Sequence, residues 1–278
     1  MMELPDRELI TATVARALAE DRATEDITAQ LTVAGHTGAA NFVARRDGVI
    51  CGLPCVAEVY RQLGGVTLTP CVADGDRVSA GTVLAAARGD LVALLAGERT
   101  ALNFLTHLSG IATLTEQFVA AVQGTAAGIY DTRKTIPGLR QLAKYAVRCG
   151  GGRNHRMDLA ALALVKDNHA AACGSPAAAA AAVKPRLAPG VLLQVEIDAL
   201  ADLEPVIAAG ADLVLLDNMT PAQVRAAVAA ARGRVELEVS GGVNLATVRA
   251  YAAAGAQRIS IGALTHSAPQ LDCALDFA

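Results

Sequence analysis

The chain has 278 residues and a mass of 28.4 kDa, enough for one large domain or two modest ones with a buried core, which excludes a small module held by disulfides or metal. Its 24 Lys and Arg against 27 Asp and Glu give a net charge of −3, and aromatic residues make up 3%, so we expect no general nucleic-acid binding. Every uninterrupted apolar stretch is shorter than the ~18 residues that span a bilayer, and the N-terminus carries acids, so we predict neither a membrane span nor a signal peptide.

The cysteines indicate a cellular compartment. The six thiols lie mostly in apolar or Ala-rich segments, and none forms a Cys-x-x-Cys pair. This usage is typical of reduced thiols rather than of a zinc or disulfide framework. We therefore expect a cytoplasmic protein.

The first 123 residues predict a helix, then strands, then a linking helix. Asp6 or Thr11 can begin a helix that runs through Ala19. Residues 41–89 hold alternating apolar segments separated by turns that contain glycine, as strands do. Residues 98–123 have apolar side chains at helical spacing, with Gly110 as a potential break, and predict a helix that links two domains.

A different pattern begins beyond residue 124. Short apolar runs alternate with Ala-rich stretches of helical pattern, including residues 177–182, as in repeated βα units. The spacing of about 22 residues from Glu196 to Asp217 and on to Ser240 matches the short units of a (β/α) barrel. The near-continuous apolar runs also indicate parallel strands that are covered on both faces.

Six of the predicted strands end in charged or small polar residues. These are Asp131 with Arg133 and Lys134, then Lys166, Glu196, Asp217, Ser240 with Gly241 and Gly242, and Gly262. The strand ends of a parallel barrel converge on one mouth, where barrel enzymes place their chemistry. We therefore expect these residues to share a site, with the plainer alternative that polar residues follow any strand that leaves the core.

The distribution of charge supports an anion site. Residues 131–169 hold eight Lys or Arg against three acids, a local charge of +5 in a chain of net charge −3. Exposed helix faces normally mix signs, which limits repulsion. The concentrated positive charge therefore indicates anion binding, with a solvated helix face as the alternative for some of these residues.

Two kinds of ligand-binding residue occur at the strand ends. Gly241 and Gly242 lack a Cβ atom, so their backbone N–H groups can approach an oxyanion, and Gly262 occupies the place of the common barrel phosphate site. Glu196 and Asp217 offer the oxygen ligands that Mg²⁺ prefers. Alternatively, these two carboxylates form salt bridges with the basic cluster.

The segment DTRKTIPGLRQLAKYAVRCGGGRNHR, residues 131–156, carries a resemblance to a known family. With GERTALN upstream and ALALVKDNH, VEID, LLDNM, EVSGGVN and ISIGALTHSAPQLD downstream, it resembles quinolinate phosphoribosyltransferase, also called nicotinate-nucleotide pyrophosphorylase (carboxylating). The similar region covers residues 97–273.

The resemblance implies a fold, a reaction and an assembly. The implied α/β fold is an N-terminal α/β sandwich over residues 1–108, an open (β/α) barrel over 109–266 and a C-terminal tail over 267–278 that packs back on the sandwich. The implied reaction joins quinolinate to phosphoribosyl pyrophosphate and gives nicotinate mononucleotide, pyrophosphate and CO2, with Mg²⁺ assisting, in NAD biosynthesis. The implied assembly is a homodimer or a hexamer of dimers.

The resemblance also implies roles for individual residues. Arg133, Arg156 and Lys166 match positions that hold the two carboxylates of quinolinate, with His155 beside them, and Arg99 matches a residue that reaches into the neighbouring subunit's site. Lys134 and Lys166 would contact the phosphoribosyl donor, Glu196 and Asp217 would face the ribose hydroxyls and the metal, and Ser240, Gly241, Gly242 and Gly262 would receive a phosphate. The expected catalytic residues are thus Lys134, Lys166, Glu196 and Asp217.

Two positions depart from the family pattern. Asp158 stands where the family has glycine, and Ala161 stands where it has an acid. A carboxylate beside Arg156 can compete for that guanidinium, so the geometry of this loop is in question.

Other functions stay open on the sequence alone. A molybdate-transport-associated paralogue shares the fold, and its substrate is unknown; Lys134 and the intact NHR and KDNH strings favour the quinolinate enzyme. A Schiff-base aldolase that uses Lys166 would need one anion site rather than several. A non-catalytic phosphoribosyl-binding regulator has only Asp158 in its favour.

Overall fold

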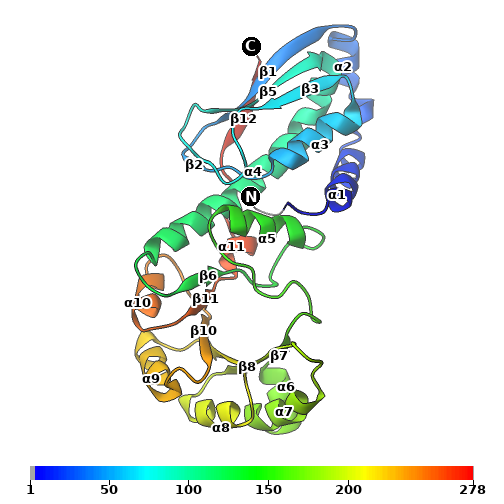
Figure 1. The fold of residues 1–278 in the computed structure, drawn as a ribbon. Coiled ribbons are helices and arrows are strands. Elements are labelled where there is room, and N and C mark those ends of the chain that lie inside the picture. Colours follow the sequence, from blue (N-terminus) through cyan, green and yellow to red (C-terminus); the bar gives the residue numbers. More distant parts are fainter. Residues whose placement is uncertain (1–3, 278) are drawn as a thin grey trace. The chain divides into compact units, whose positions relative to one another are not determined.

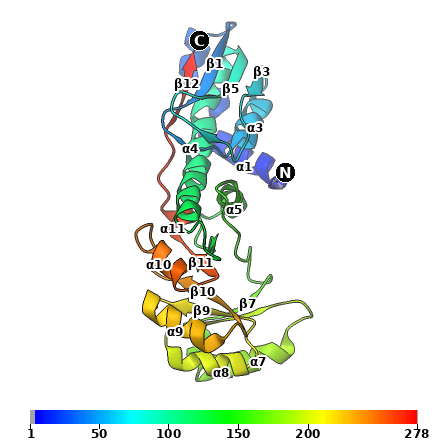
Figure 2. The same ribbon diagram turned by 60° about the vertical axis from the view of Figure 1, so that its left-hand side comes forward.

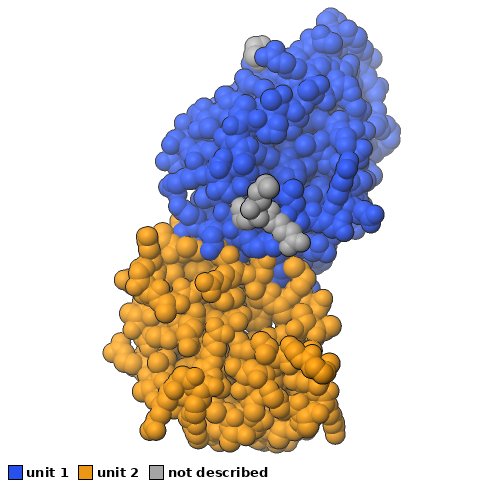
Figure 3. Space-filling model, viewed as in Figure 1, with its two compact units in different colours: residues 1–116, 135–151, 264–278 blue, residues 117–134, 152–263 orange. Residues whose placement is uncertain are grey.

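The computed structural model describes residues 4–277, which form two compact units (Figures 1 and 3). Within the described residues, the first unit comprises residues 4–116, 135–151 and 264–277, and the second comprises residues 117–134 and 152–263. Both units are therefore discontinuous along the chain. The contiguous boundaries expected after residues 108 and 266 stay a prediction.

The first unit is built on a four-stranded antiparallel sheet. Its strands pair in the order β12 (Cys273–Phe277), β1 (Thr37–Ala44), β5 (Val83–Asp90) and β3 (Val66–Pro70), and β2 (Gly48–Val49) pairs separately with β4 (Arg77–Val78). The last strand of the chain thus lies beside the first. Phe42 of β1 and Tyr60 of a neighbouring helix are buried, with ring centroids 6.1 Å apart, so the core lies between the sheet and this helix.

Some helices of the first unit begin at a side-chain cap. The helices are α1 (Arg7–Glu20), α2 (Ile27–Thr32), α3 (Leu53–Leu63), α4 (Leu91–Ala121), α5 (Arg140–Cys149) and α11 (Ala263–His266), with a 3₁₀ turn η1 (Ala23–Glu25); α4 and α11 extend across the unit boundary. The Asp6 carboxylate accepts the N–H of Glu8 at 2.8 Å, which caps α1 and confirms the first predicted helix.

Helix α4 is longer than the sequence pattern predicts. It begins at Leu91 rather than near residue 98, because the Asp90 carboxylate accepts the N–H of Ala93 at 2.9 Å and so caps an earlier turn. The helix also continues through Gly110, where a break was considered. A Cβ atom there would lie 2.2 Å from the carbonyl oxygen of Pro269, so this glycine permits a close backbone approach.

The second unit is a six-stranded parallel sheet with helices outside it. The strands pair in the order β6 (Gly128–Tyr130), β11 (Arg258–Ser260), β10 (Glu236–Ser240), β9 (Leu213–Asp217), β8 (Leu193–Ile197) and β7 (Ala163–Val165). The helical segments are α6 (Asp167–Cys173), α7 (Pro176–Val183), η2 (Lys184–Arg186), η3 (Leu200–Asp202), α8 (Leu203–Ala208), α9 (Pro221–Ala231) and α10 (Val248–Ala253). Both views place α7 to α10 along the outer face of the strands (Figures 1 and 2).

This topology confirms the predicted α/β fold with an open (β/α) barrel. The sheet begins at β6 and ends at β7, and no pairing between these two outer strands occurs within residues 4–277. The strands are parallel, so their carboxyl ends lie along one edge of the sheet. The Ala-rich residues 177–182 belong to α7, as predicted, with the Ser175 hydroxyl accepting the N–H of Ala178 at 3.1 Å.

Candidate active site at the carboxyl ends of the barrel strands

A cavity of about 390 Å³ lies at the carboxyl ends of the barrel strands. Eight residues singled out from the sequence line it: Arg133, Lys134, His155, Arg156, Lys166, Glu196, Asp217 and Ser240. Thr132, Leu164, Leu215, Glu238 and Ser260 complete the lining. Residues that are up to about a hundred positions apart in the chain therefore meet at one edge of a parallel sheet, as barrel geometry requires.

A buried carboxylate anchors the two basic segments of this cavity. Asp131 follows β6 directly and has no exposed surface. Its carboxylate accepts the Nδ2–H of Asn154 at 2.6 Å and the backbone N–H of His155 at 2.8 Å. The backbone of Arg153 also pairs with β6, through its N–H to the carbonyl of Ile129 and its carbonyl to the N–H of Asp131. The segments that carry Arg133 and Arg156 are thus fixed side by side.

The guanidinium of Arg156 is held by the loop that follows it. Its Nη1 donates to the carbonyl of Leu162 at 2.9 Å. Burial and the charge of Arg133 lower the pKa of Arg156, and the charge of Asp158 opposes this shift. The Asp158 carboxylate accepts the N–H groups of Ala160 and Ala161 at 2.9 and 3.0 Å. The departure at position 158 therefore caps its own loop and also acts electrostatically on Arg156.

Two carboxylates and one ammonium group lie at the ends of β7, β8 and β9. The Nζ atom of Lys166 is 3.6 Å from a carboxylate oxygen of Glu196. Burial raises the pKa of Glu196; the charge of Lys166 opposes the shift and the charge of Asp217 adds to it. Two nearby carboxylates that repel each other are the kind of donor set that a divalent cation stabilises.

The segments that follow β9 and β10 approach each other closely at Asn218 and Gly241. Asn218 and Gly241 have positive φ angles of 53° and 94°. A Cβ atom on Gly241 would lie 2.9 Å from the backbone nitrogen of Asn218, and the φ angle of Gly241 is positive, so glycine suits this backbone approach. Ser240 lines the cavity, whereas Gly241, Gly242 and Gly262 follow the ends of β10 and β11 and are outside the set of described residues that line it.

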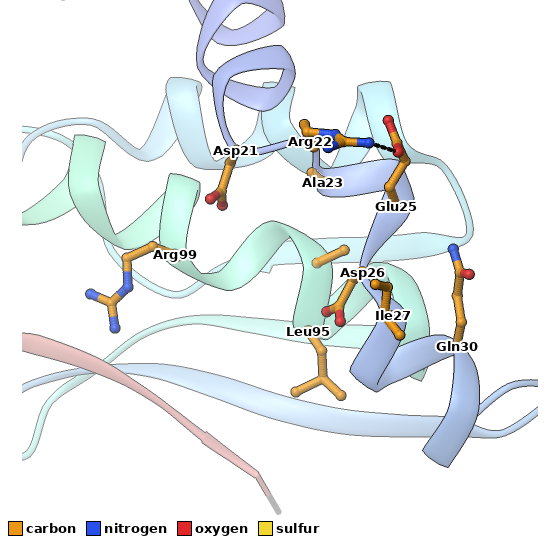
Figure 4. A pocket seen from close by; sticks show the side chains of 10 residues that line it. Asp21, Arg22, Ala23, Glu25, Asp26, Ile27, Gln30, Leu95 and Arg99 are labelled. Carbon is orange, nitrogen blue, oxygen red and sulfur yellow. Dashed lines mark hydrogen bonds and ion pairs between the residues drawn. The ribbon is translucent and has the colours of Figure 1, made fainter.

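Arg99 lies in the first unit, on α4. It lines a cavity of about 660 Å³ with residues around α2, where Arg99 and Asp21 lie on one side and Glu25 and Gln30 on the other (Figure 4). It also lines a second cavity of about 480 Å³ with His107. Among the charged residues predicted to bind substrate or metal, the barrel cavity therefore gathers all except Arg99.

Sequence reasoning missed the buried polar residues inside the barrel. Gln194, Glu238 and Ser260 lie on β8, β10 and β11 and are almost completely buried. Their signal was present, because each is a polar residue within a short predicted strand. Residues that end a strand are marked by the change from apolar to polar sequence, whereas a polar residue inside a strand carries no such mark of its partner.

An open parallel barrel whose mouth gathers guanidinium, ammonium and carboxylate groups defines an α/β-barrel enzyme for anionic substrates. The family model for the C-terminal domain of quinolinate phosphoribosyl transferase matches residues 111–276, and the model for the N-terminal domain matches residues 26–109. The chain belongs to the quinolinate phosphoribosyl transferase family.

Individual relatives resemble the chain over nearly its whole length. A nicotinate-nucleotide pyrophosphorylase [carboxylating] of Mycobacterium leprae is 47% identical over 276 residues, which are 95% of each chain. A probable nicotinate-nucleotide pyrophosphorylase [carboxylating] of Bacillus subtilis is 40% identical over 92% of this chain and 89% of that one. The solved structure of the nicotinate-nucleotide pyrophosphorylase from Francisella tularensis has a TM-score of 0.94 at 38% identity and covers 100% of this chain and 98% of that one.

Over residues 4–277, each helix is too short or too polar to cross a bilayer.

Proposed function

We propose that the chain transfers the phosphoribosyl group of phosphoribosyl pyrophosphate to quinolinate with loss of CO2, giving nicotinate mononucleotide and pyrophosphate. The observation that carries this proposal is the meeting of Arg133, Arg156 and Lys166 with Glu196 and Asp217 around one cavity. Three cations suit a flat dicarboxylate and a polyphosphate, and two carboxylates suit the hydroxyls of a ribose. Family membership supplies the reaction class.

In this proposal, quinolinate binds beside β6 and β7. Planar guanidinium groups bind carboxylates through two parallel hydrogen bonds, so Arg133 and Arg156 would each hold one carboxylate, with Lys166 as a third positive charge. Their positions are supported by the anchor at Asp131, which accepts hydrogen bonds from the segment that precedes Arg156.

The phosphoribosyl donor would bind toward β9, β10 and β11. Lys134 and Lys166 would contact its pyrophosphate, Glu196 and Asp217 would accept hydrogen bonds from the ribose, and the turn of Ser240, Gly241 and Gly242 with Gly262 would receive the 5′-phosphate. No covalent enzyme nucleophile is required. Positive side chains stabilise the departing pyrophosphate, and the pyridine nitrogen captures the ribose C1.

The donor set fits Mg²⁺, and we propose that Glu196 and Asp217 hold it. Their carboxylate oxygens line the same cavity, and the charge of Asp217 helps to raise the pKa of Glu196. Mg²⁺ usually takes one or two protein carboxylates and completes its shell with water and substrate phosphate. When bound, it would offset the charge on the leaving pyrophosphate.

We further propose a cytoplasmic homodimer or a hexamer of dimers in which Arg99 acts in the partner's site. The support is that Arg99 is the one predicted substrate-binding cation outside the barrel cavity. Arg99→Ala and Arg156→Ala chains, each with a raised KM for quinolinate when alone, should regain part of the wild-type turnover at low quinolinate when mixed, because hybrid dimers contain one intact site. No recovery in heterodimers verified by mass spectrometry would contradict a shared site.

One assay tests the reaction. The purified protein is incubated with quinolinate, phosphoribosyl pyrophosphate and Mg²⁺, and CO2 and nicotinate mononucleotide are measured. Equal amounts of both products support the proposal. Turnover of another acceptor without CO2 release would favour the molybdate-associated paralogue, and borohydride trapping of a carbonyl substrate on Lys166 would favour the aldolase.

A further inference from the structure

Glu238 is a fully buried carboxylate that the proposed chemistry does not use. It lies on β10, has no exposed surface and lines the barrel cavity from the interior. A carboxylate in such a place needs several donors, because burial without them is costly. Residues from other strands supply them. Gln194 donates to Glu238 at 2.9 Å, Ser260 donates at 2.6 Å, and Arg258 forms an ion pair at 3.1 Å.

These contacts determine how His155 is protonated. The amide nitrogen of Gln194 faces Glu238 and donates to it. The amide oxygen Oε1 therefore faces His155, 3.0 Å from Nε2, and must accept a hydrogen bond from the ring. The second Glu238 oxygen lies 3.4 Å from the same Nε2 atom. Nδ1 accepts the backbone N–H of Arg156 at 2.8 Å. A ring that donates from Nε2 and accepts at Nδ1 is the neutral Nε2–H tautomer.

The network therefore ends at the main chain of Arg156. Both nitrogens of His155 already contact protein groups, and its side chain is only 7% exposed. Arg156 itself carries the guanidinium that faces the proposed quinolinate site. On the other side, Asp131 holds the backbone N–H of His155. Two buried carboxylates thus fix this short segment, one through the main chain and one through the imidazole ring.

We propose that Glu238 is a positioning residue for substrate binding, which acts through Gln194 and His155 to fix Arg156 in the orientation that binds a dicarboxylate. This inference rests on the proposed function, because it assigns quinolinate to Arg156. Glu238 touches no substrate in this role. It fixes the orientation of the Gln194 amide, which in turn determines which nitrogen of His155 carries the proton.

Glu238→Gln should break the relay without changing the size of the side chain. A glutamine at this position can donate to Gln194, which allows the Gln194 amide to reverse and donate to Nε2 of His155. The ring proton then moves to Nδ1, where it opposes the N–H of Arg156. The main chain at Arg156 would lose its acceptor, and the guanidinium would lose its fixed position.

The kinetic test separates positioning from a general loss of structure. In Glu238→Gln the KM for quinolinate should rise about tenfold or more, since small misplacements of a binding group cost that much, while the KM for the donor and kcat change less than about threefold. The matched control is Glu236→Gln, two residues earlier on β10, which removes an exposed carboxylate 3.5 Å from the same Arg258. Its KM for quinolinate should stay within about twofold of wild type. An unchanged KM in Glu238→Gln, or an equal rise in both variants, would overturn the proposal.

The tautomer test does not depend on turnover. In protein labelled with ¹⁵N-histidine, long-range ¹H–¹⁵N spectra should report the Nε2–H form of His155 in wild type and the Nδ1–H form in Glu238→Gln. The signal is assigned by its loss in His155→Asn. The Nδ1–H form in wild type would overturn the proposal even if the enzyme turns over quinolinate. The Nε2–H form with no turnover would instead refute the proposed function and leave the relay intact.

A second variant covers poor folding. If Glu238→Gln does not fold, Gln194→Met removes the relay and leaves Glu238 its contacts with Ser260 and Arg258. It should show the same selective rise in the KM for quinolinate, and an unchanged KM would count against the proposal.

Discussion

Two buried glutamates, one in each unit, hold their charge in different ways. Glu58 of α3 accepts two hydrogen bonds from Arg61 and one from Gln62, all at 2.6 to 2.7 Å, so most of its donors lie on its own helix. Thr11 of α1 is a further hydrogen-bond donor to this carboxylate. These bonds, the first of them from Arg61, outweigh burial and lower the pKa of Glu58 from 4.5 to about 2. Its charge is therefore held mainly by neighbouring residues of α3.

Glu238 takes its donors from other parts of the barrel. Burial alone would raise its pKa, but contact with His155, the hydrogen bond from Ser260 and the charge of Arg258 bring it below the ordinary value. Its charge therefore holds residues that line the barrel cavity in place. A buried acid with mostly local donors therefore stabilises one helix, whereas a buried acid with distant donors fixes separate parts of the chain relative to each other.

The largest expected effect concerns a site cation. Lys166→Met should reduce kcat/KM at least about a hundredfold, because an ammonium group aimed at a departing pyrophosphate acts mainly in the transition state. The control is Lys184→Met in the same unit, which removes a lysine bound to Asp212 at 2.7 Å, away from the cavity. Steady-state kinetics check this, and comparable losses in both variants would contradict a specific role for Lys166.

The next effect concerns the guanidinium pair. Arg133→Ala or Arg156→Ala should raise the KM for quinolinate about ten- to a hundredfold, since a lost charge-assisted contact costs roughly 1.5 to 3 kcal/mol. Arg225→Ala, on the exposed face of α9, serves as the control. Initial-rate measurements with quinolinate varied provide the values. Wild-type kinetics in both Arg133→Ala and Arg156→Ala would show that quinolinate does not bind at these two arginines.

Glu58 should affect stability and leave catalysis unchanged. Because its folded pKa lies below its unfolded value, its stabilisation is present above pH 4.5 and is lost as the pH falls toward about 2. Glu58→Gln should therefore lower the free energy of unfolding by about 1 to 2 kcal/mol at pH 7 and by much less at pH 2.5.

Urea unfolding at the two pH values measures this difference. The control is Glu20→Gln, an exposed residue of α1. A destabilisation of Glu58→Gln that does not depend on pH would show that packing, and not charge, is lost. A raised KM for quinolinate in Glu58→Gln would show that Glu58 also affects substrate binding, which contradicts the contrast with Glu238.

The smallest effect concerns thiols, which are buried without compensating donors. Burial, followed by the charges of Asp74 and Glu58, raises the pKa of Cys55 to about 12, and burial raises that of Cys273 to about 11. Cys71 and Cys173 are exposed. At pH 8 iodoacetamide should label the exposed pair first, because a pKa near 12 lowers the thiolate fraction about a thousandfold.

Peptide mass spectrometry over time checks the order of labelling, and labelling of the exposed pair should leave turnover unchanged. Equal rates at Cys55 and Cys71 in folded protein would contradict the rule that burial without donors suppresses ionisation. Guanidinium-unfolded protein, in which all six thiols react, is the control.

The fold was predictable from the sequence where contacts are local. Apolar periodicity located the βα units, Asp6 marked the start of α1, and the residues that end the strands, such as Lys166 and Asp217, marked one edge of the barrel. The start of α4 at Leu91 was missed because a capping aspartate at the end of a strand outweighed the helical periodicity. Gly110 was misjudged as a potential break because its reason, the approach of Pro269, lies far away in the chain.

The family, the parallel barrel and most charged residues of the site follow from the amino-acid sequence, because parallel strands place their ends at one edge whatever the details of packing. How those charges are held depends on contacts between strands that are distant in the chain. His155, Gln194 and Glu238 are linked by hydrogen bonds that span 39 and 44 positions of the chain. Periodicity reports which side of a strand is buried, but the partner of a buried polar group is selected by which strands become neighbours. That selection is made by the fold as a whole.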